Sequence, residues 1–199
     1  RLSAVQDRLR RMAQQKKDQG VDYETAQRQF LQARNEALRH YARAETLAYR
    51  GLPAERRLEM RFRLAWLHWA SGDLVRAAVV AEHLVRRWPE RPEGRAAAEI
   101  AAKAWRTLFR LARSDDERRF AAERLEEAAE LIERQWPGSP EGDAAWMMLM
   151  DTAADRRDGA KAHEYLERIA ADSPRRPQAE ARLGRTTRPA ARGAGTEKR

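Results

Sequence analysis

A ten-residue segment that occurs twice constrains this chain more than any other feature. Residues 88–97 read WPERPEGRAA and residues 136–145 read WPGSPEGDAA, while SPRRPQAEA at 173–181 is a weaker third copy. The first proline of each copy predicts the end of a helix, because proline lacks an N–H and disfavours helical geometry in the residue before it. The second proline and the glycine favour a short turn and a new helix. The chain should therefore consist of helices joined by the same kind of turn three times.

Between these joints the apolar residues recur with the 3.6-residue period of a helix, and no strand-like alternation interrupts them. Small residues lie in the middle of each stripe, where a neighbouring helix must approach closely, and large ones lie toward its end. We expect the stripes to form the core of an all-α protein, with Trp88 and Trp136 inside it because they repeat with the joint. The stripes are Leu74, Ala77, Ala78, Ala81, Leu84, Val85 and Trp88, then Leu125, Ala128, Ala129, Ile132 and Trp136, then Ala162, Tyr165, Leu166 and Ile169.

The segment GDLVRA at 72–77, followed by Ala81, Leu84 and Pro89, resembles the second-helix signature of the tetratricopeptide repeat family. DYETA at 22–26, with Phe30 and Ala33, resembles the same signature, and DGAKA at 158–162 is a looser match. The joints are also similar to those of tetratricopeptide proteins of bacterial cell envelopes. One unit departs from the family, because the offset of 48 residues between the two best joints exceeds the usual period of about 34.

This resemblance implies an α–α superhelix, or solenoid, of about four helical hairpins within residues 1–183. We expect the hairpins at about 3–50, 54–88, 95–136 and 143–173. In the long third hairpin, the first helix should run to about Arg113 and Ser114 should cap the next one. Residues 184–199 lack periodic apolar positions, so we expect a disordered basic tail there.

The charge of the chain lies mainly at its ends. The formal net charge is +9, with a pI of about 10.5. Residues 1–19 carry six basic and two acidic side chains, and residues 175–199 carry eight basic and two acidic ones, which leaves the middle close to neutral. This distribution argues against a basic nucleic-acid-binding body. Binding of nucleic acid or an anionic surface through the arginine-rich ends is the less favoured alternative.

Motifs that carry catalysis or hold cofactors are absent from the sequence. There is no cysteine, no glycine-rich phosphate loop, no Gly-x-Ser-x-Gly elbow, no His-Glu-x-x-His and no acidic calcium loop. The histidines are far apart and have only carboxylate neighbours at helical spacing (His40, His68, His83 and His163). We therefore expect no enzyme activity, cofactor, metal or small-molecule substrate.

No apolar run approaches the roughly 20 residues that a membrane-spanning helix needs. The chain begins at Arg1 rather than at a methionine, so we expect it to be a piece of a longer precursor. The sequence leaves open whether it works in the cytoplasm or in the cell envelope.

The resemblance implies where a ligand would bind, because peptides of this family usually lie on the concave wall, against first-helix positions two, five, nine and twelve. Aromatic residues and methionine favour an interface there, although aromatic stripes are also common in cores. The hypothesis is a helix or extended segment lying across Phe62, Trp66, Lys103 and Arg106. The full set of carried-over positions is Glu59, Phe62, Trp66 and Trp69 in the second hairpin, Ala96, Glu99, Lys103 and Arg106 in the third, and Ala144, Met147, Asp151 and Ala154 in the fourth.

These observations together favour a non-catalytic scaffold that binds another protein, whose identity the sequence does not contain. The alternative is a structural module that associates with itself, because the terminal hairpin of a solenoid leaves an apolar face that a second copy can cover.

Overall fold

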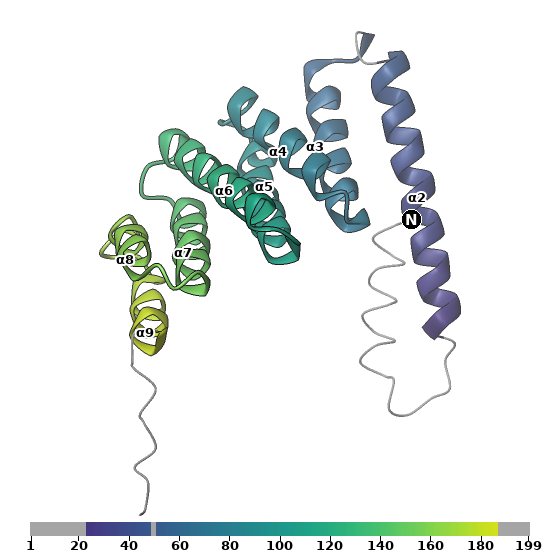
Figure 1. Ribbon diagram of the computed structural model, residues 1–199. Helices are drawn as coiled ribbons and strands as arrows, with labels where there is room; N and C mark the ends of the chain where they lie inside the picture. Colours follow the sequence, from purple (N-terminus) through teal and green to yellow (C-terminus); the bar gives the residue numbers. More distant parts are fainter. Residues whose placement is uncertain (1–22, 49–50, 187–199) are drawn as a thin grey trace, which may run out of the picture. The chain divides into compact units, whose positions relative to one another are not determined.

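The structure is a computed structural model that describes residues 23–48 and 51–186, and every regular element in this part of the chain is an α-helix (Figure 1). The all-α class expected from the sequence is thus confirmed. The helices are α2 (Tyr23–Ala48), α3 (Ala54–Ser71), α4 (Leu74–Arg87), α5 (Pro92–Leu111), α6 (Asp115–Gln135), α7 (Pro140–Asp155), α8 (Gly159–Glu167) and α9 (Arg176–Thr186).

The chain divides into two compact units, residues 1–108 and residues 109–199. The described part of unit 1 contains α2, α3, α4 and most of α5. Unit 2 contains the last residues of α5 and helices α6 to α9. The division falls inside α5, and the two units are described separately below.

The repeated segment ends one helix and begins another in both of its best copies. Trp88 is the C-terminal cap of α4, with its backbone N–H on the carbonyl of Leu84 at 2.9 Å, and α5 begins at Pro92. Trp136 ends α6 in the same way, and α7 begins at Pro140. The prediction drawn from the prolines is confirmed at both places, because a proline can occupy the first turn of a helix without losing a hydrogen bond.

Short side chains at the helix starts satisfy backbone N–H groups that have no partner inside the helix. Ser114 accepts a hydrogen bond from the N–H of Glu117 at 3.1 Å, as expected, although α5 ends at Leu111, two residues earlier than the sequence suggested. The turn between α3 and α4 depends on Gly72, whose φ of 82° lies in the left-handed region that favours glycine.

The core of unit 1 forms where α3 packs against α2 and α4. Ala77, Ala78 and Ala81 of α4 are fully buried, and their small side chains allow the neighbouring helix to come close. Leu58 and Leu67 of α3 are almost completely buried as well. The alanine stripe identified in the sequence is therefore the packing face of α4.

In unit 2, α7 lies at the centre and packs against α6, α8 and α9. Leu149 and Met150 of α7 are 1% exposed, and Ile169, just after α8, is also buried. Trp146 of α7 stacks on Tyr165 of α8, with ring centroids 6.1 Å apart. A central helix covered from several sides explains why α7 buries residues around most of its circumference.

Two structural expectations drawn from the sequence are wrong. Trp88 and Trp136 are half-buried and not core residues, because each occupies the cap at a helix end, where fewer neighbours surround its ring. The expected disordered tail at 184–199 begins too early, because residues 184–186 complete α9, which packs on α7 and α8 through the buried Ala179 and Leu183. Residues 187–199, and the first helix expected within 3–50, lie outside the described residues.

Candidate functional site

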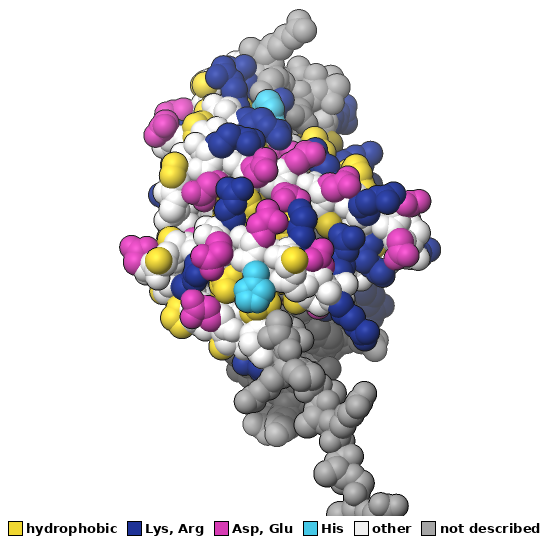
Figure 2. Space-filling model, turned by 60° about the vertical axis from the view of Figure 1, so that its left-hand side comes forward, with side chains coloured by type: hydrophobic (Ala, Val, Ile, Leu, Met, Phe, Trp, Pro, Cys, Tyr) yellow, Lys and Arg dark blue, Asp and Glu magenta, His cyan; other side chains and the backbone are white. Residues whose placement is uncertain are grey.

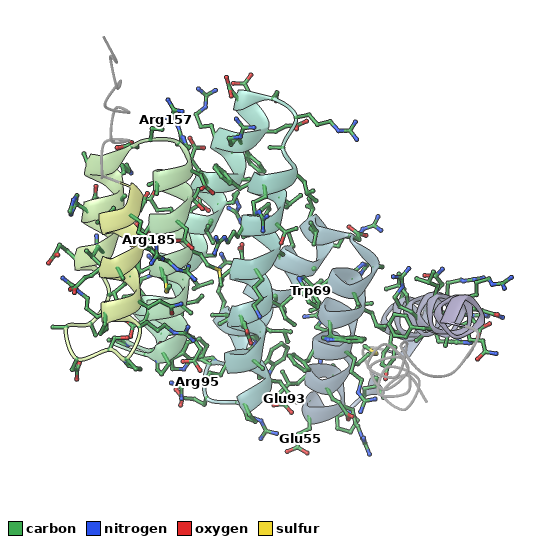
Figure 3. All side chains as sticks on the ribbon, turned by 90° about the horizontal axis from the view of Figure 1, so that it is seen from below. Glu55, Trp69, Glu93, Arg95, Arg157 and Arg185 are labelled. Carbon is green, nitrogen blue, oxygen red and sulfur yellow. The ribbon has the colours of Figure 1, made fainter. Side chains whose placement is uncertain are left out.

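Helix α3 carries an aromatic surface that we call the α3 face, formed by Glu59, Phe62, Trp66 and Trp69. These positions are three or four residues apart and therefore share one side of the helix. Phe62 and Trp66 are half-buried, and Trp69, labelled in Figure 3, is 38% exposed. The α3 face thus lies at the border between the core of unit 1 and solvent. Its aromatic residues are neither fully buried, as core residues would be, nor fully exposed.

Ion pairs hold the polar end of the α3 face. The carboxylate of Glu59 pairs with Arg56 at 3.0 Å and with Arg63 at 2.6 Å. The hydrogen bond from Arg56 and the charge of Arg63 lower the pKa of Glu59. Arg63 also donates a hydrogen bond to the hydroxyl of Tyr41 in α2 at 3.2 Å. The lowered pKa favours the ionised form of Glu59, which has two arginines of the same helix as partners.

The expected charged positions of α5 also share one helix side, because Glu99, Lys103 and Arg106 are four and three residues apart. Glu99 and Lys103 are exposed and form an ion pair at 2.5 Å, and Arg106 is half-buried. Ala96, one turn earlier, is exposed. An ion pair at 3.8 Å between Arg91 and Glu55 brings the first turn of α3 close to the segment that precedes α5. Unit 1 thus contains both the aromatic and the charged positions that the sequence selected.

The remaining expected groove residues belong to unit 2, and the structure places them differently. Met147 is 6% exposed and belongs to the core. Asp151 accepts a hydrogen bond from Arg182 of α9 at 2.7 Å, so its carboxylate is used within the unit. Ala144 and Ala154 are half-buried. Met147 therefore lies in the core of unit 2 and the carboxylate of Asp151 is engaged by Arg182, while their role in a partner-binding groove stays a prediction.

The structure contains two hollows that the sequence did not predict, and each of them lies within one unit. In unit 1 an apolar hollow of about 370 Å³ lies among α2, α3 and α4, and its walls include Ala42, Leu64, Val75 and Val79. In unit 2 a hollow of about 420 Å³ is lined by the residues Phe109, Arg110, Arg118, Asp155 and Arg156. Their walls come from separate helices, so no local sequence pattern could have indicated either one.

Possible metal ligands in the described part of the chain lie apart from one another. No group of three or more His, Cys, Asp or Glu side chains among residues 23–48 and 51–186 is arranged to hold a metal ion. His68 is 7% exposed and its Nδ1 lies 3.3 Å from a carboxylate oxygen of Asp73. His83 contacts the guanidinium of Arg61 and the ring of Trp88. These histidines take part in local contacts of α3 and α4.

The described helices include none that combines the length and the apolar composition required to cross a bilayer.

Charged side chains of both signs are mixed over much of the face drawn in Figure 2. Part of the arginine-rich C-terminal end is described, and two of its arginines, Arg176 and Arg182, form ion pairs within the unit. Arg176 pairs with Glu167 at 2.8 Å and with Glu180 at 2.9 Å, and it also donates to backbone carbonyls at the end of α8. Arginines held in this way are less available to a nucleic acid, although binding through the remaining ends stays an untested prediction.

Comparison of the chain with protein-family models, with curated proteins and with solved structures finds no match. Its function must therefore be argued from its own residues.

Proposed function

We propose that this chain is a non-catalytic scaffold for protein–protein interaction, in which a peptide or helix of another protein lies across the α3 face and the charged side of α5. The observation that carries the proposal is the 38% exposure of Trp69 on the same side of α3 as the half-buried Phe62 and Trp66. A large aromatic side chain left partly in water beside two others is costly for a monomer and favourable for an interface.

The surrounding charges support this use. Buried aromatic anchors supply most of the binding energy at interfaces, while charged residues at the rim set the orientation and the rate of association. The α3 face offers the anchors Phe62, Trp66 and Trp69. The carboxylate of Glu59, which is paired with Arg63, and the exposed pair of Glu99 and Lys103 supply charges of both signs in the same unit. A segment with an apolar side and some charge would complement this combination.

The wider architecture that we propose is a stack of tetratricopeptide-like hairpins forming an α–α superhelix. Local features of two helix pairs support it. In α3–α4, Asp73 accepts a hydrogen bond from the N–H at the start of α4, and Ala77 and Ala81 are fully buried. In α7–α8, Asp158 accepts from the N–H of Lys161 at 3.0 Å and Ala162 is fully buried. An acidic cap followed by a buried alanine is the pattern that the family resemblance implies.

Selection of peptides tests the proposal. A peptide-display library is selected on the full 199-residue chain, and the affinity of each selected peptide is then measured on variants of unchanged helicity. We expect Trp69→Ala and Trp66→Ala to weaken binding by about thirtyfold, the effect of losing a side chain worth about 2 kcal/mol at an interface. The matched control is Val79→Ala, which truncates a 54% exposed residue of α4. A selection that yields no binders, or binders that tolerate both tryptophan variants, would refute the proposal.

Self-association is the second candidate, favoured by a different observation. Val75 and Val79 on α4 are 50% and 54% exposed and border the apolar hollow of unit 1, so a second copy could cover them. Sedimentation velocity over a hundredfold range of protein concentration separates the candidates. A monomer throughout this range removes self-association, and a dimer that Val79→Lys dissociates supports it.

A further inference from the structure

The hollow in unit 2, which we call the Arg110 pocket, is lined by Phe109, Arg110, Arg118, Asp155 and Arg156 and has a volume of about 420 Å³. Phe109 is 4% exposed and provides an apolar floor. The other four side chains are exposed or half-buried, so the pocket is open to solvent. Its walls are the last turn of α5, the first turn of α6 and the end of α7, and all of them belong to unit 2.

Positively charged residues outnumber negatively charged ones in the lining of this pocket, which contains three arginines and one aspartate. Arg118 is partly used, because it pairs with Asp115 at 3.3 Å. Arg110 and Arg156 have no ion pair in the described part of the chain, and neither does Asp155. Two arginines that line one hollow, one in α5 and one just after α7, and that have no ion pair there are suited to binding an oxyanion.

The single carboxylate narrows the class of ligand. Asp155 would repel a polyanion such as a nucleic acid strand, which brings phosphates and few donors that could reach it. A peptide with an acidic side chain brings both a carboxylate for the arginines and backbone N–H groups for Asp155. The carboxylate of such a peptide complements the arginines of the pocket, and its backbone N–H groups complement Asp155.

We propose that the Arg110 pocket binds an acidic segment of a partner protein. A side-chain carboxylate of that segment lies between Arg110 and Arg156, and one of its backbone N–H groups donates to Asp155. This site is formed by unit 2 alone, and the proposal does not depend on binding at the α3 face.

Fluorescence anisotropy of a labelled dodecapeptide with a single glutamate among glycine and serine residues, titrated with the full chain at low salt, tests this inference. We expect Arg110→Gln and Arg156→Gln each to weaken binding by about fivefold, the effect of losing one partly exposed charge pair. The matched control is Arg175→Gln. It removes the same charge from an exposed arginine of unit 2 that has no ion pair in the described residues and lies outside the pocket. This control should change the affinity by less than about twofold.

A second variant distinguishes a peptide from a polyanion. Asp155→Asn should weaken binding of the peptide, because a backbone N–H loses a charged acceptor. It should strengthen binding of a single-stranded DNA dodecamer, because a repulsive charge is removed. The proposal is overturned if the peptide does not bind, if Arg175→Gln costs as much as the pocket variants, or if Asp155→Asn strengthens peptide binding. The last outcome would assign the pocket to a phosphate-rich ligand instead.

Discussion

The indole N–H of Trp105 donates a hydrogen bond of 2.7 Å to the carboxylate of Glu82, and each of these side chains is 2% exposed. Glu82 also pairs with Arg86 one turn later in α4 at 3.0 Å. A buried carboxylate is costly unless it is both paired and hydrogen-bonded, and here a residue of the neighbouring helix completes the arrangement. The bond therefore ties α4 to α5 at one specific register.

Trp105→Phe removes this donor while keeping most of the ring volume. We expect the free energy of unfolding to fall by about 1–3 kcal/mol, because one hydrogen bond to a buried charge is lost. Urea denaturation followed by circular dichroism measures the change. The same substitution at the 38% exposed Trp69 is the control and should cost less than about 0.5 kcal/mol. Equal losses at the two positions would show that the Glu82 bond contributes nothing specific.

Gly94→Ala should destabilise unit 1, because a Cβ at this position would overlap the carbonyl oxygen of Trp88 and lie 2.9 Å from its carbonyl carbon. Backbone atoms cannot move aside cheaply, so we expect a loss of about 1–3 kcal/mol. At Gly142 the nearest atom is the flexible carboxylate of Glu133, at 2.9 Å, and the same substitution should cost less.

Gly159 completes this series, because no atom lies within 4 Å of the added Cβ. Alanine there should stabilise the protein by roughly 0.4–1 kcal/mol by restricting the unfolded chain. Thermal unfolding of the three alanine variants checks the order, and a Gly94 variant as stable as the Gly159 variant would contradict the packing described for α5.

Arg157→Gly should stabilise unit 2. Arg157 has a φ of 60°, a left-handed conformation that is unfavourable for a side chain with a Cβ, and it follows the end of α7 where glycine is usual. We expect a gain of about 0.5–1 kcal/mol in the free energy of unfolding. The control is Arg168→Gly, at an αR cap with φ of −79°, which should instead lose stability. A lower melting temperature for Arg157→Gly would contradict the local geometry.

Alkaline titration tests the environment of Tyr165. Burial raises the pKa of its hydroxyl to about 12, against the hydrogen bond that Lys161 donates from 3.3 Å. An unfolded tyrosine ionises near pH 10, so the folded chain holds more protons between the two values, and its stability should fall as the pH rises from about 10 to about 12. In the Tyr165→Phe variant, stability should fall less over the same pH range, because no buried phenol is left to ionise at this position.

Ultraviolet absorbance of tyrosinate gives a direct measurement of the same group. The chain has four tyrosines, and the variant should lack the phenol whose pKa burial raises to about 12. If all phenols of the native protein titrate together near pH 10, the burial assigned to Tyr165 is incorrect.

Much of the helix pattern could be predicted from the sequence, because the signals that end a helix act within a few residues. The prolines after Trp88 and Trp136, the glycine at Gly72 and the cap at Ser114 all mark boundaries that the structure contains. The alanine stripe of α4 was also predictable, because helical periodicity determines which residues share a face. Helix α9 was missed since its apolar pattern rests on only two buried residues, Ala179 and Leu183.

The candidate sites were less predictable, because periodicity does not say which neighbour covers a given face. The sequence offered no means of telling exposed groove residues from core residues among Phe62, Trp66 and Met147. In the structure the first two are half-buried, and Met147 is buried in unit 2. The Arg110 pocket left no sequence signal, because its arginines come from α5, from α6 and from the residue that follows α7.

The sequence by itself determined that this chain is helical, where most of its helices begin and end, and which stripe of each one is apolar. Only the tertiary structure decided that Glu82 is buried against Trp105, that Asp151 is paired with Arg182 and that Trp69 stays in contact with water. The physical reason is range. Caps and helix breakers act through adjacent backbone groups, whereas burial and charge pairing depend on side chains brought together from distant parts of the chain.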